Sequence, residues 1–411
     1  MPENRDRDTN LIVRLLKNIW RNIKITFPYF LLGVLLTALY QRYVPSRWIA
    51  GLFGANQGFG TLMAAALGVP LYTCGGGTIP LMAAGCVKIQ NPGETDSVFP
   101  KHDPYGSGIG TKPGRVVWAY DPQSVEWDGT GYWWELGNFQ ESSIQRMVDD
   151  GIAGLAGAAD TESGWNALFQ SHNSDRGRDG SYQNGQKIAI KVNMKGAGAY
   201  GEETKGETRE SYTNPVLLKT LLISLVTKAG VSPGDITVYD AGRIIPDYVQ
   251  ELCREDVLSG VQFRYRDLPG EHDARPDLNV PVIWSKFVRG EMNYLPSCVT
   301  EADYLINLAN LKGHVYGITL TAKNHYGSIM NSNRMRAPEA AGVHRFLTQN
   351  RMETYTVLVD LKANYELGGK TMLYMLDGII CAPGESVPIT GENSRWQQEP
   401  FLGDYTSSVF L

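Results

Sequence analysis

The sequence has few cysteines, and no two of them form a recognised motif. Five occur in 411 residues, at scattered positions: Cys74, Cys86, Cys253, Cys298 and Cys381. The absence of any C-x-x-C excludes a zinc ribbon and a self-contained iron–sulfur motif, and the scatter gives no disulfide framework. The chain also lacks a serine-centred nucleophile elbow, so that a hydrolase of that type is not expected.

An excess of positive charge is missing as well. The formal net charge is −5, which argues against general nucleic-acid binding. The charge is unevenly distributed, because residues 1–48 hold eight Lys and Arg against three acids. That segment therefore carries +5 and the remainder −10. The cationic segment surrounds an uncharged run of sixteen residues, Ile25–Tyr40.

The run Ile25–Tyr40 predicts a retained transmembrane helix. A bilayer core needs about 20 apolar residues, and the span has room to extend at either end. A signal peptide would begin nearer the N-terminus and end in small residues, whereas LYQRYVPSRW follows here. Six cations precede the run and two follow it, which places the N-terminus in the cytoplasm. A second apolar stretch, Phe59–Leu71, is short and rich in glycine. If Phe59–Met82 crosses the membrane, the remaining chain lies in the cytoplasm, and if it does not, the remaining chain lies outside.

From about residue 88 the composition becomes that of a soluble protein in which strands and helices alternate. Strands are expected at 115–120, 187–194, 235–242, 261–267, 302–310, 354–361 and 371–383. Helices are expected at 142–157, 164–173, 213–230, 246–256 and 338–349. This order predicts an α/β fold with a mainly parallel sheet and helices on both faces, preceded by one or two transmembrane helices. The expected division is 1–86 for the membrane segment, 87–114 for a linker and 115–411 for the α/β domain.

Polar residues collect just past the predicted strand ends, where such a sheet binds ligands. Small and apolar residues surround many of them. The group consists of Lys191, Asn193, Lys195, Asp240, Arg243, Lys312, His314, Lys323, Asn324, His325 and Asp377. A lysine desolvated there would have a lowered pKa and would suit a base, a Schiff-base former or an anchor for phosphate or carboxylate. Solvated loop charge is the alternative for each residue.

Roles can be assigned within this group. His314 and Lys323 are the candidate catalytic residues, His314 for proton transfer and Lys323 for holding a carboxylate. The candidate ligand-binding residues are Lys191, Asn193, Asp240, Lys312 and Asn324. His314 and His325 are candidate metal ligands, although histidines eleven apart lack a recognised ligand spacing. Histidines satisfied by backbone carbonyls are the alternative.

The stretch Gly196–Gly201 formally matches G-x-G-x-x-G. A dinucleotide site would also need a helix that opens at the third glycine and an acid about 20 residues later. Here a polar segment follows, and the next helix starts only near Pro215. We therefore favour a mobile loop over a nucleotide site.

The soluble part resembles a known family. The segments that carry the resemblance are IAIKVNM, TNPVLLKTLLISLVTKAG, ITVYDAG, INLANLKGHVYGITLTAKNHYGSI and MLDGIICAP. Together they resemble domain-of-unknown-function family 362 over about residues 115–411. Its hallmarks are matched by Lys191/Asn193, Asn214/Pro215, Lys312/His314 and Lys323/Asn324. The resemblance implies an α/β fold in a bacterial or archaeal protein and, from relatives with an iron–sulfur module, a redox protein partner.

The N-terminal part resembles a different family. GVLLTALYQRYVP and GLFGANQGFGTLMAAALGVPLYTCGGGTIPL are similar to a predicted permease family related to organoarsenical efflux permeases, over about residues 25–85. Cys74 occupies the position of that family's membrane cysteine. About 85 residues are too few to form the several membrane spans that such a permease needs. A natural fusion and a joined reading frame both explain the junction, and the resemblance to family 362 breaks off at Leu411, as in a truncated frame.

Three functions follow as hypotheses. The first is an inner-membrane-tethered α/β domain that binds a small anionic ligand, with a divalent metal as the candidate cofactor. The second is a permease fragment that binds a thiophilic ion through Cys74. The third is a non-catalytic scaffold. The expected partners are the membrane, the anionic ligand and a redox protein, but not nucleic acid.

Overall fold

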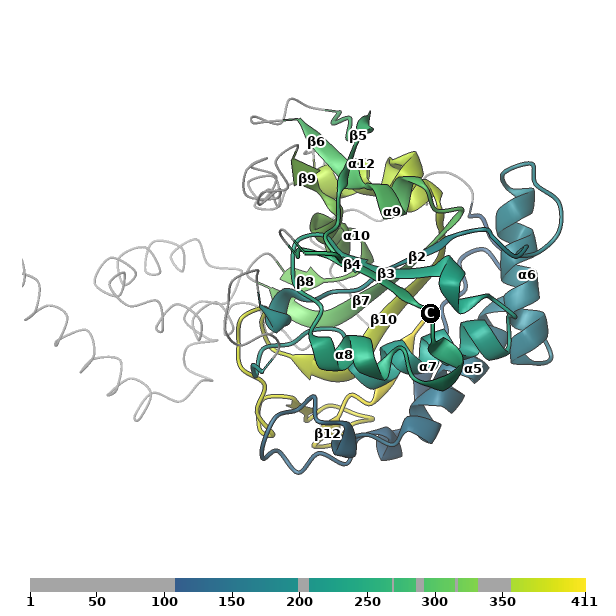
Figure 1. Cartoon of the computed structure of the whole chain (residues 1–411). Helices are drawn as coiled ribbons and strands as arrows, with labels where there is room; N and C mark the ends of the chain where they lie inside the picture. The colour runs from purple at the N-terminus through teal and green to yellow at the C-terminus, as the bar shows by residue number, and fades with distance from the viewer. Residues whose placement is uncertain (1–107, 199–206, 268–269, 286–291, 315–316, 332–355) are drawn as a thin grey trace, which may run out of the picture. The chain divides into compact units, whose positions relative to one another are not determined.

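The computed structural model describes residues 108–198, 207–267, 270–285, 292–314, 317–331 and 356–411 (Figure 1). The chain divides into two compact units, residues 1–102 and 103–411, and all described residues belong to the second. The predicted transmembrane run, Cys74 and the predicted helix at 338–349 therefore lie outside the described residues. Within the described ranges, no helix is both long and apolar enough to cross a bilayer.

An eight-stranded sheet runs through the second unit. Its order is β1-β13-β10-β7-β2-β3-β4, and β8 pairs with β7. The strands are β1 (Trp118–Tyr120), β2 (Ile188–Lys191), β3 (Ile236–Asp240), β4 (Gln262–Tyr265), β7 (Tyr304–His314), β8 (Gly317–Thr319), β10 (Thr371–Ala382) and β13 (Ser408–Phe410). The five strands from β10 to β4 run parallel, whereas β1, β13 and β8 pair antiparallel. The predicted mixed α/β fold with a mostly parallel sheet is confirmed.

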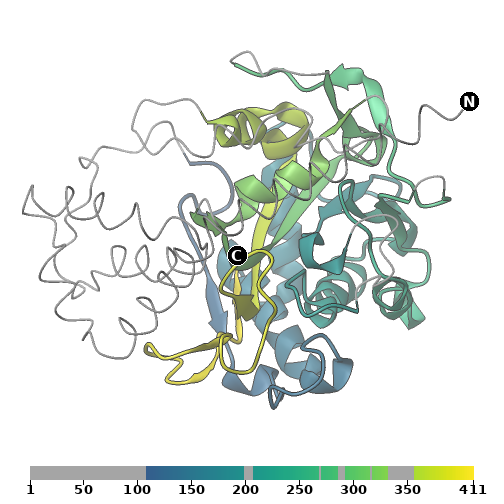
Figure 2. The same cartoon turned by 90° about the vertical axis from the view of Figure 1, so that its left-hand side faces the viewer.

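Helices flank this sheet on its two sides (Figures 1 and 2). One set comprises α5 (Glu141–Ala156), α6 (Thr161–Ser174), α7 (Pro215–Thr227) and α8 (Asp247–Leu252). The other comprises α9 (Ser297–Thr300), α10 (Thr321–Asn324) and α12 (Val357–Ala363). Successive strand residues point to opposite faces. Accordingly, Ile188 and Ile190 belong to the core cluster of α7, whereas Ala189 belongs to the cluster of α12.

Helix α7 shows how local sequence fixes an element beside the sheet. The Asn214 side chain accepts hydrogen bonds from the backbone N–H groups of Val216 and Leu217, at 2.9 and 3.0 Å. Pro215 occupies the first turn, where a missing N–H has no cost. Gly230, with φ of 70°, follows the end of the helix. The helix therefore starts at Pro215, near which the sequence predicted its start.

Other elements differ from the predictions. The segment 354–361, predicted as a strand because of its β-branched residues, contains the start of helix α12. Thr356 caps that helix, and Val357 and Leu361, four residues apart, pack into one core cluster. Tertiary packing thus overrides the local strand propensity. The sequence also gave no sign of the separate three-stranded sheet of β5 (Pro276–Pro281), β6 (Asn293–Pro296) and β9 (Met330–Asn331).

Candidate functional site

A row of polar side chains crosses the sheet on the face of α10 and α12. The strand registers pair Lys191 with Tyr239 and with Asn307, and Asn307 with Tyr374. Paired residues of neighbouring parallel strands project from the same face. Asn307 also donates to the carbonyl of Thr321, at 2.9 Å, so this row lies beneath α10. Tyr239 pairs in turn with Arg264 of β4, so five adjacent strands contribute one polar position each to this row.

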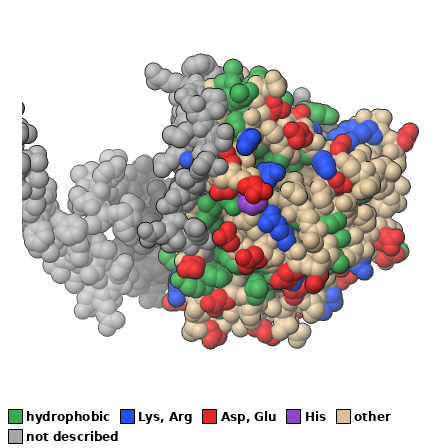
Figure 3. All heavy atoms as spheres, in the orientation of Figure 1, with side chains coloured by type: hydrophobic (Ala, Val, Ile, Leu, Met, Phe, Trp, Pro, Cys, Tyr) green, Lys and Arg blue, Asp and Glu red, His purple; other side chains and the backbone are tan. Residues whose placement is uncertain are grey.

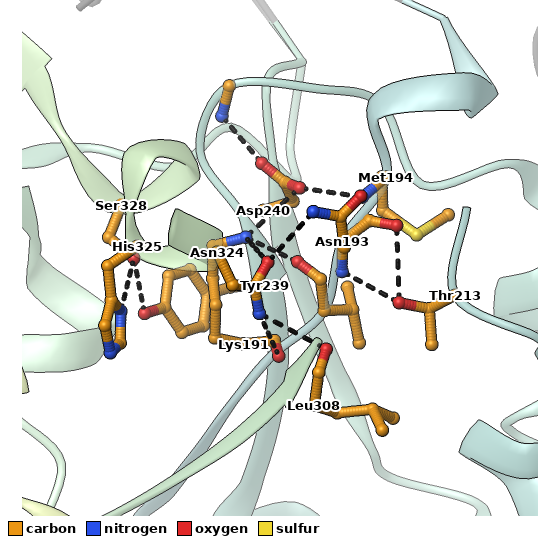
Figure 4. Close-up of polar contacts among 12 residues, drawn as sticks. Lys191, Asn193, Met194, Thr213, Tyr239, Asp240, Leu308, Asn324, His325 and Ser328 are labelled. Atoms are coloured by element: carbon orange, nitrogen blue, oxygen red, sulfur yellow. Dashed lines mark hydrogen bonds and ion pairs between the residues drawn. The ribbon is translucent and has the colours of Figure 1, made fainter. Parts of the chain in front are cut away.

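The centre of the row is a buried ion pair. Lys191 Nζ lies 3.2 Å from Asp240 Oδ2, and the two side chains are 1% and 4% exposed. Asp240 also accepts hydrogen bonds from the backbone N–H groups of Met194 and Gly242, both at 3.0 Å (Figure 4). Burial lowers the pKa of Lys191, and the neighbouring Asp240 opposes that shift. Lys191 and Asp240 are the last residues of β2 and β3, so the ion pair joins the ends of these two strands.

Gly327 lies directly against this pair. A Cβ atom at position 327 would stand 2.7 Å from both Asp240 Oδ1 and Lys191 Nζ. The Gly327 carbonyl accepts a hydrogen bond from the N–H of Ala241, at 2.9 Å. A side chain at position 327 would therefore displace one of the two charged groups or the turn η6 (His325–Ser328).

Asn324 connects α10 to the strand ends. Its Nδ2 lies within hydrogen-bonding distance of the carbonyls of Lys191 and Leu308, at 3.3 and 3.2 Å (Figure 4). The same Nδ2 lies 2.9 Å from Asn307 Oδ1. Its Oδ1 accepts from Asn193 Nδ2, at 3.3 Å. The predicted residues Lys191, Asn193, Asp240 and Asn324 therefore form one network. This network holds Asn324 in place and thereby fixes the backbone of the preceding residue, Lys323.

His325 is part of the same buried layer. It is 0% exposed, and its Nε2 accepts a hydrogen bond from Asn307 Nδ2, at 2.8 Å. Its Nδ1 lies 3.4 Å from Ser328 Oγ, which in turn lies 2.9 Å from the Tyr239 hydroxyl. Burial, with smaller effects of Lys362 and Lys191, holds the pKa of His325 well below its usual value. A neutral imidazole with both nitrogens engaged thus supports the turn.

A second polar group lies on the opposite face, at the N-terminus of α7. Asp377 Oδ2 accepts from the backbone N–H of Asn214, at 2.8 Å, and from Asn310 Nδ2, at 3.1 Å. Burial raises the pKa of Asp377 to about 6. Lys312 Nζ donates to the carbonyl of Ser211, at 2.7 Å. Burial, and then the charges of Lys195 and Lys323, lower the pKa of Lys312 to about 7.

The carboxyl edge of the sheet carries the remaining lysines. Lys195 Nζ lies 3.2 Å from a carboxylate oxygen of Glu210 and 2.8 Å from Ser386 Oγ. Lys323 is half-buried, and its Nζ lies 5.7 Å from the centre of the Tyr326 ring. Among the described residues, Lys323 has no hydrogen-bond or ion-pair partner. Burial first, and then Lys195, lower its pKa to about 8.

His314 lies elsewhere, at the end of β7. It forms an ion pair with Glu385, which follows β10. Asn307, whose side chain is hydrogen-bonded to His325, lies seven positions before His314 in β7. At roughly 3.3 Å per residue, seven positions of a strand span about 23 Å. The structure therefore does not bring His314 and His325 together. In the part of the chain that the structure describes, no three metal-ligating side chains form a group, and the candidate metal stays a prediction.

Charged side chains of both signs gather on the face seen in Figure 3, with a histidine among them.

Several residues of the polar groups on the two faces and at the carboxyl edge of the sheet were not identified from the sequence. They are Asn307, Asn310, Ser211, Glu210, Tyr326 and Ser328. Asn307 and Asn310 carried a usable signal, since amides within an apolar strand must find partners when they are buried.

Comparison with known families gives two matches. The family described as "Domain of unknown function (DUF362)" matches residues 188–398, and the family described as "Predicted permease" matches residues 6–89. No curated protein matches the chain. The first match spans half of the chain and contains β2, β3, β7, β10 and α10 with both polar groups. The protein therefore belongs to the DUF362 family, preceded by a segment similar to a predicted permease.

Proposed function

We propose that the carboxyl edge of the sheet binds a small anionic ligand through Lys195, Lys312 and Lys323. The observation that carries this proposal is the environment of Lys323, which is half-buried, lacks a hydrogen-bond or ion-pair partner among the described residues and, unlike Lys362, has its pKa lowered by a second lysine, Lys195. A desolvated ammonium without a counter-charge is unfavourable. An anion bound beside it would supply that charge.

The charge balance of the edge favours an anion. Lys195 has one carboxylate partner, Glu210, while Lys312 is bonded to a neutral carbonyl and Lys323 to no polar group in the described residues. The charges of Glu210 and Asp377 also act on Lys312, so that three lysines face two carboxylates. The three lysines are close enough for their charges to lower the pKa values of Lys312 and Lys323. A ligand carboxylate or phosphate would relieve this repulsion and would raise both pKa values.

The neighbouring network supports binding by holding the lysine in place. Asn324, next to Lys323 in α10, is hydrogen-bonded to β2 and to β7. The buried Lys191–Asp240 pair fixes the ends of β2 and β3 below it. A site built on rigid elements loses little entropy when it binds a ligand.

Binding is tested on the full chain in detergent. Oxalate, phosphate, lactate and pyruvate are added separately, and the melting temperature and the heat of binding are measured. We expect at least one anion to raise the melting temperature of the wild type and not that of Lys323→Ala.

Lys362→Ala is the matched control. Lys362 is likewise a half-buried lysine, on α12, whose Nζ lies 3.3 Å from the centre of the Tyr374 ring. This variant should respond to the anion like the wild type. An equal response of all three proteins would refute the assignment of Lys323, and no response to any anion would favour the non-catalytic scaffold.

A second function concerns the N-terminal segment. We infer from the permease match over residues 6–89 that this segment tethers the protein to a membrane and that Cys74 binds a thiophilic ion such as trivalent arsenic. Fractionation of cells should then recover the full chain with the membranes. Cys74→Ser should lower the arsenite resistance of cells that express the protein. Unchanged resistance would contradict the ion site at Cys74 and would leave the membrane tether as the remaining role of this segment.

A further inference from the structure

We propose that Lys323 is a Schiff-base-forming lysine, whose amine condenses with the carbonyl group of a small 2-oxo acid. The inference rests on the proposed anion site, since Lys195 and Lys312 of that site would hold the carboxylate of the ligand and leave the amine of Lys323 to react. It goes further in assigning a covalent reaction to one side chain. The ligand class is then an anion with an adjacent ketone or aldehyde.

Lys323 differs from most buried and half-buried lysines of the described residues. Lys191, Lys195, Lys219 and Lys370 each have a carboxylate oxygen within 3.2 Å of Nζ. An ion pair keeps a lysine protonated and therefore unreactive. Among the described residues, Lys323 has the ring of Tyr326 beside it, at 5.7 Å, and no carboxylate is paired with its nitrogen.

The cationic neighbours of Lys323 favour its neutral form. A lysine becomes a nucleophile when it is desolvated or lies next to another cation. Lys323 meets both conditions, because it is half-buried and the charge of Lys195 lowers its pKa. Its pKa of about 8 leaves part of the amine unprotonated near neutral pH.

The cationic side chains of Lys195 and Lys312 suit the carboxylate of the ligand.

In the condensation, the Nζ lone pair attacks the carbonyl carbon, and the carbon–oxygen double bond is replaced by a carbon–nitrogen double bond. The carbonyl oxygen leaves as water with the two hydrogens of the amine. A proton taken up by the imine nitrogen gives the iminium ion. No oxidant or reductant takes part.

Lys362 serves as the internal comparison. Like Lys323, it is half-buried, has no hydrogen-bond or ion-pair partner among the described residues, and has a pKa lowered to about 8 by burial. It lies directly on the face of Tyr374, at 3.3 Å. No lysine charge contributes to its lowered pKa, in contrast to Lys323. If burial alone made a lysine react with 2-oxo acids, Lys362 would react as well.

The test traps the imine. The full chain in detergent is incubated with pyruvate and sodium borohydride, and peptides are analysed by mass spectrometry. We expect the reduced pyruvate adduct on Lys323 in the wild type and in Lys362→Arg, and only background labelling in Lys323→Arg. The arginine keeps the positive charge, so lactate, which has no carbonyl group, should still raise the melting temperature of Lys323→Arg.

The outcomes separate the two proposals. An anion-induced rise in melting temperature without an adduct on Lys323 would overturn the Schiff base and leave the anion site. Equal labelling of Lys323 and Lys362 would also overturn it, as non-selective amine chemistry. Neither an adduct nor a rise in melting temperature with any anion would overturn both proposals.

Discussion

The two lysine groups of this sheet contrast sharply. Lys191, on the face of α10, is buried and bonded to Asp240 and to neutral acceptors, so that its charge is fully partnered. Lys312 and Lys323 have no carboxylate partner in the described residues. The same residue type thus has its charge balanced by a carboxylate in one place and not in the other. Partners, and not burial alone, distinguish the two groups.

The largest expected effect comes from breaking the fully partnered group. Asp240→Ala leaves the buried ammonium of Lys191 without its counter-charge, which should destabilise the protein by about 3–5 kcal/mol. Urea unfolding of the full chain measures the change. The double variant Lys191→Met, Asp240→Leu removes both charges and should be considerably more stable than Asp240→Ala. A double variant as unstable as the single one would contradict the ion-pair account.

A pH effect of similar size is expected from Asp377. Burial raises its folded-state pKa from 3.8 to about 6, so the folded state binds the proton more tightly than the unfolded state. Stability contributed by this group is therefore full below about pH 4 and falls as the pH rises to about 6, by roughly 3 kcal/mol. Urea unfolding between pH 4 and 8 measures this, and Asp377→Asn should flatten the profile. An unchanged profile in the variant would assign the effect to other groups.

A smaller loss is expected from Gly327→Ala, which forces a methyl group against the Lys191–Asp240 pair. Overpacking of this kind costs about 1–3 kcal/mol. Gly234→Ala is the control, because its nearest neighbouring atom would lie 4.0 Å from the added carbon. Equal melting temperatures for the two variants would show that the turn moves away without cost.

The smallest effect on stability is expected at the edge. Lys323→Ala removes a side chain without a hydrogen bond or ion pair in the described residues, so unfolding free energy should change by less than about 1 kcal/mol. Thermal unfolding without added anions measures it. A loss as large as that of Asp240→Ala would show that Lys323 is a structural residue and would remove the contrast.

The sequence predicted the alternation of strands and helices and the collection of polar residues at strand ends. It did not predict on which face each residue lies. Lys191 and Lys312 belong to opposite faces because β2 and β7 pair in a register that sets Lys191 beside Asn307. Register between distant strands is a non-local property. For the same reason, the distance between His314 and His325 could not be derived from their spacing.

The most direct test of the central claim is the binding of anions to the full chain by calorimetry, for the wild type, Lys323→Ala and Lys362→Ala. We predict saturable binding of at least one small anion to the wild type and Lys362→Ala, and a loss of at least about tenfold in affinity for Lys323→Ala, which corresponds to about 1.4 kcal/mol. Equal affinity of the three proteins would contradict the claim that Lys323 binds the ligand and Lys362 does not.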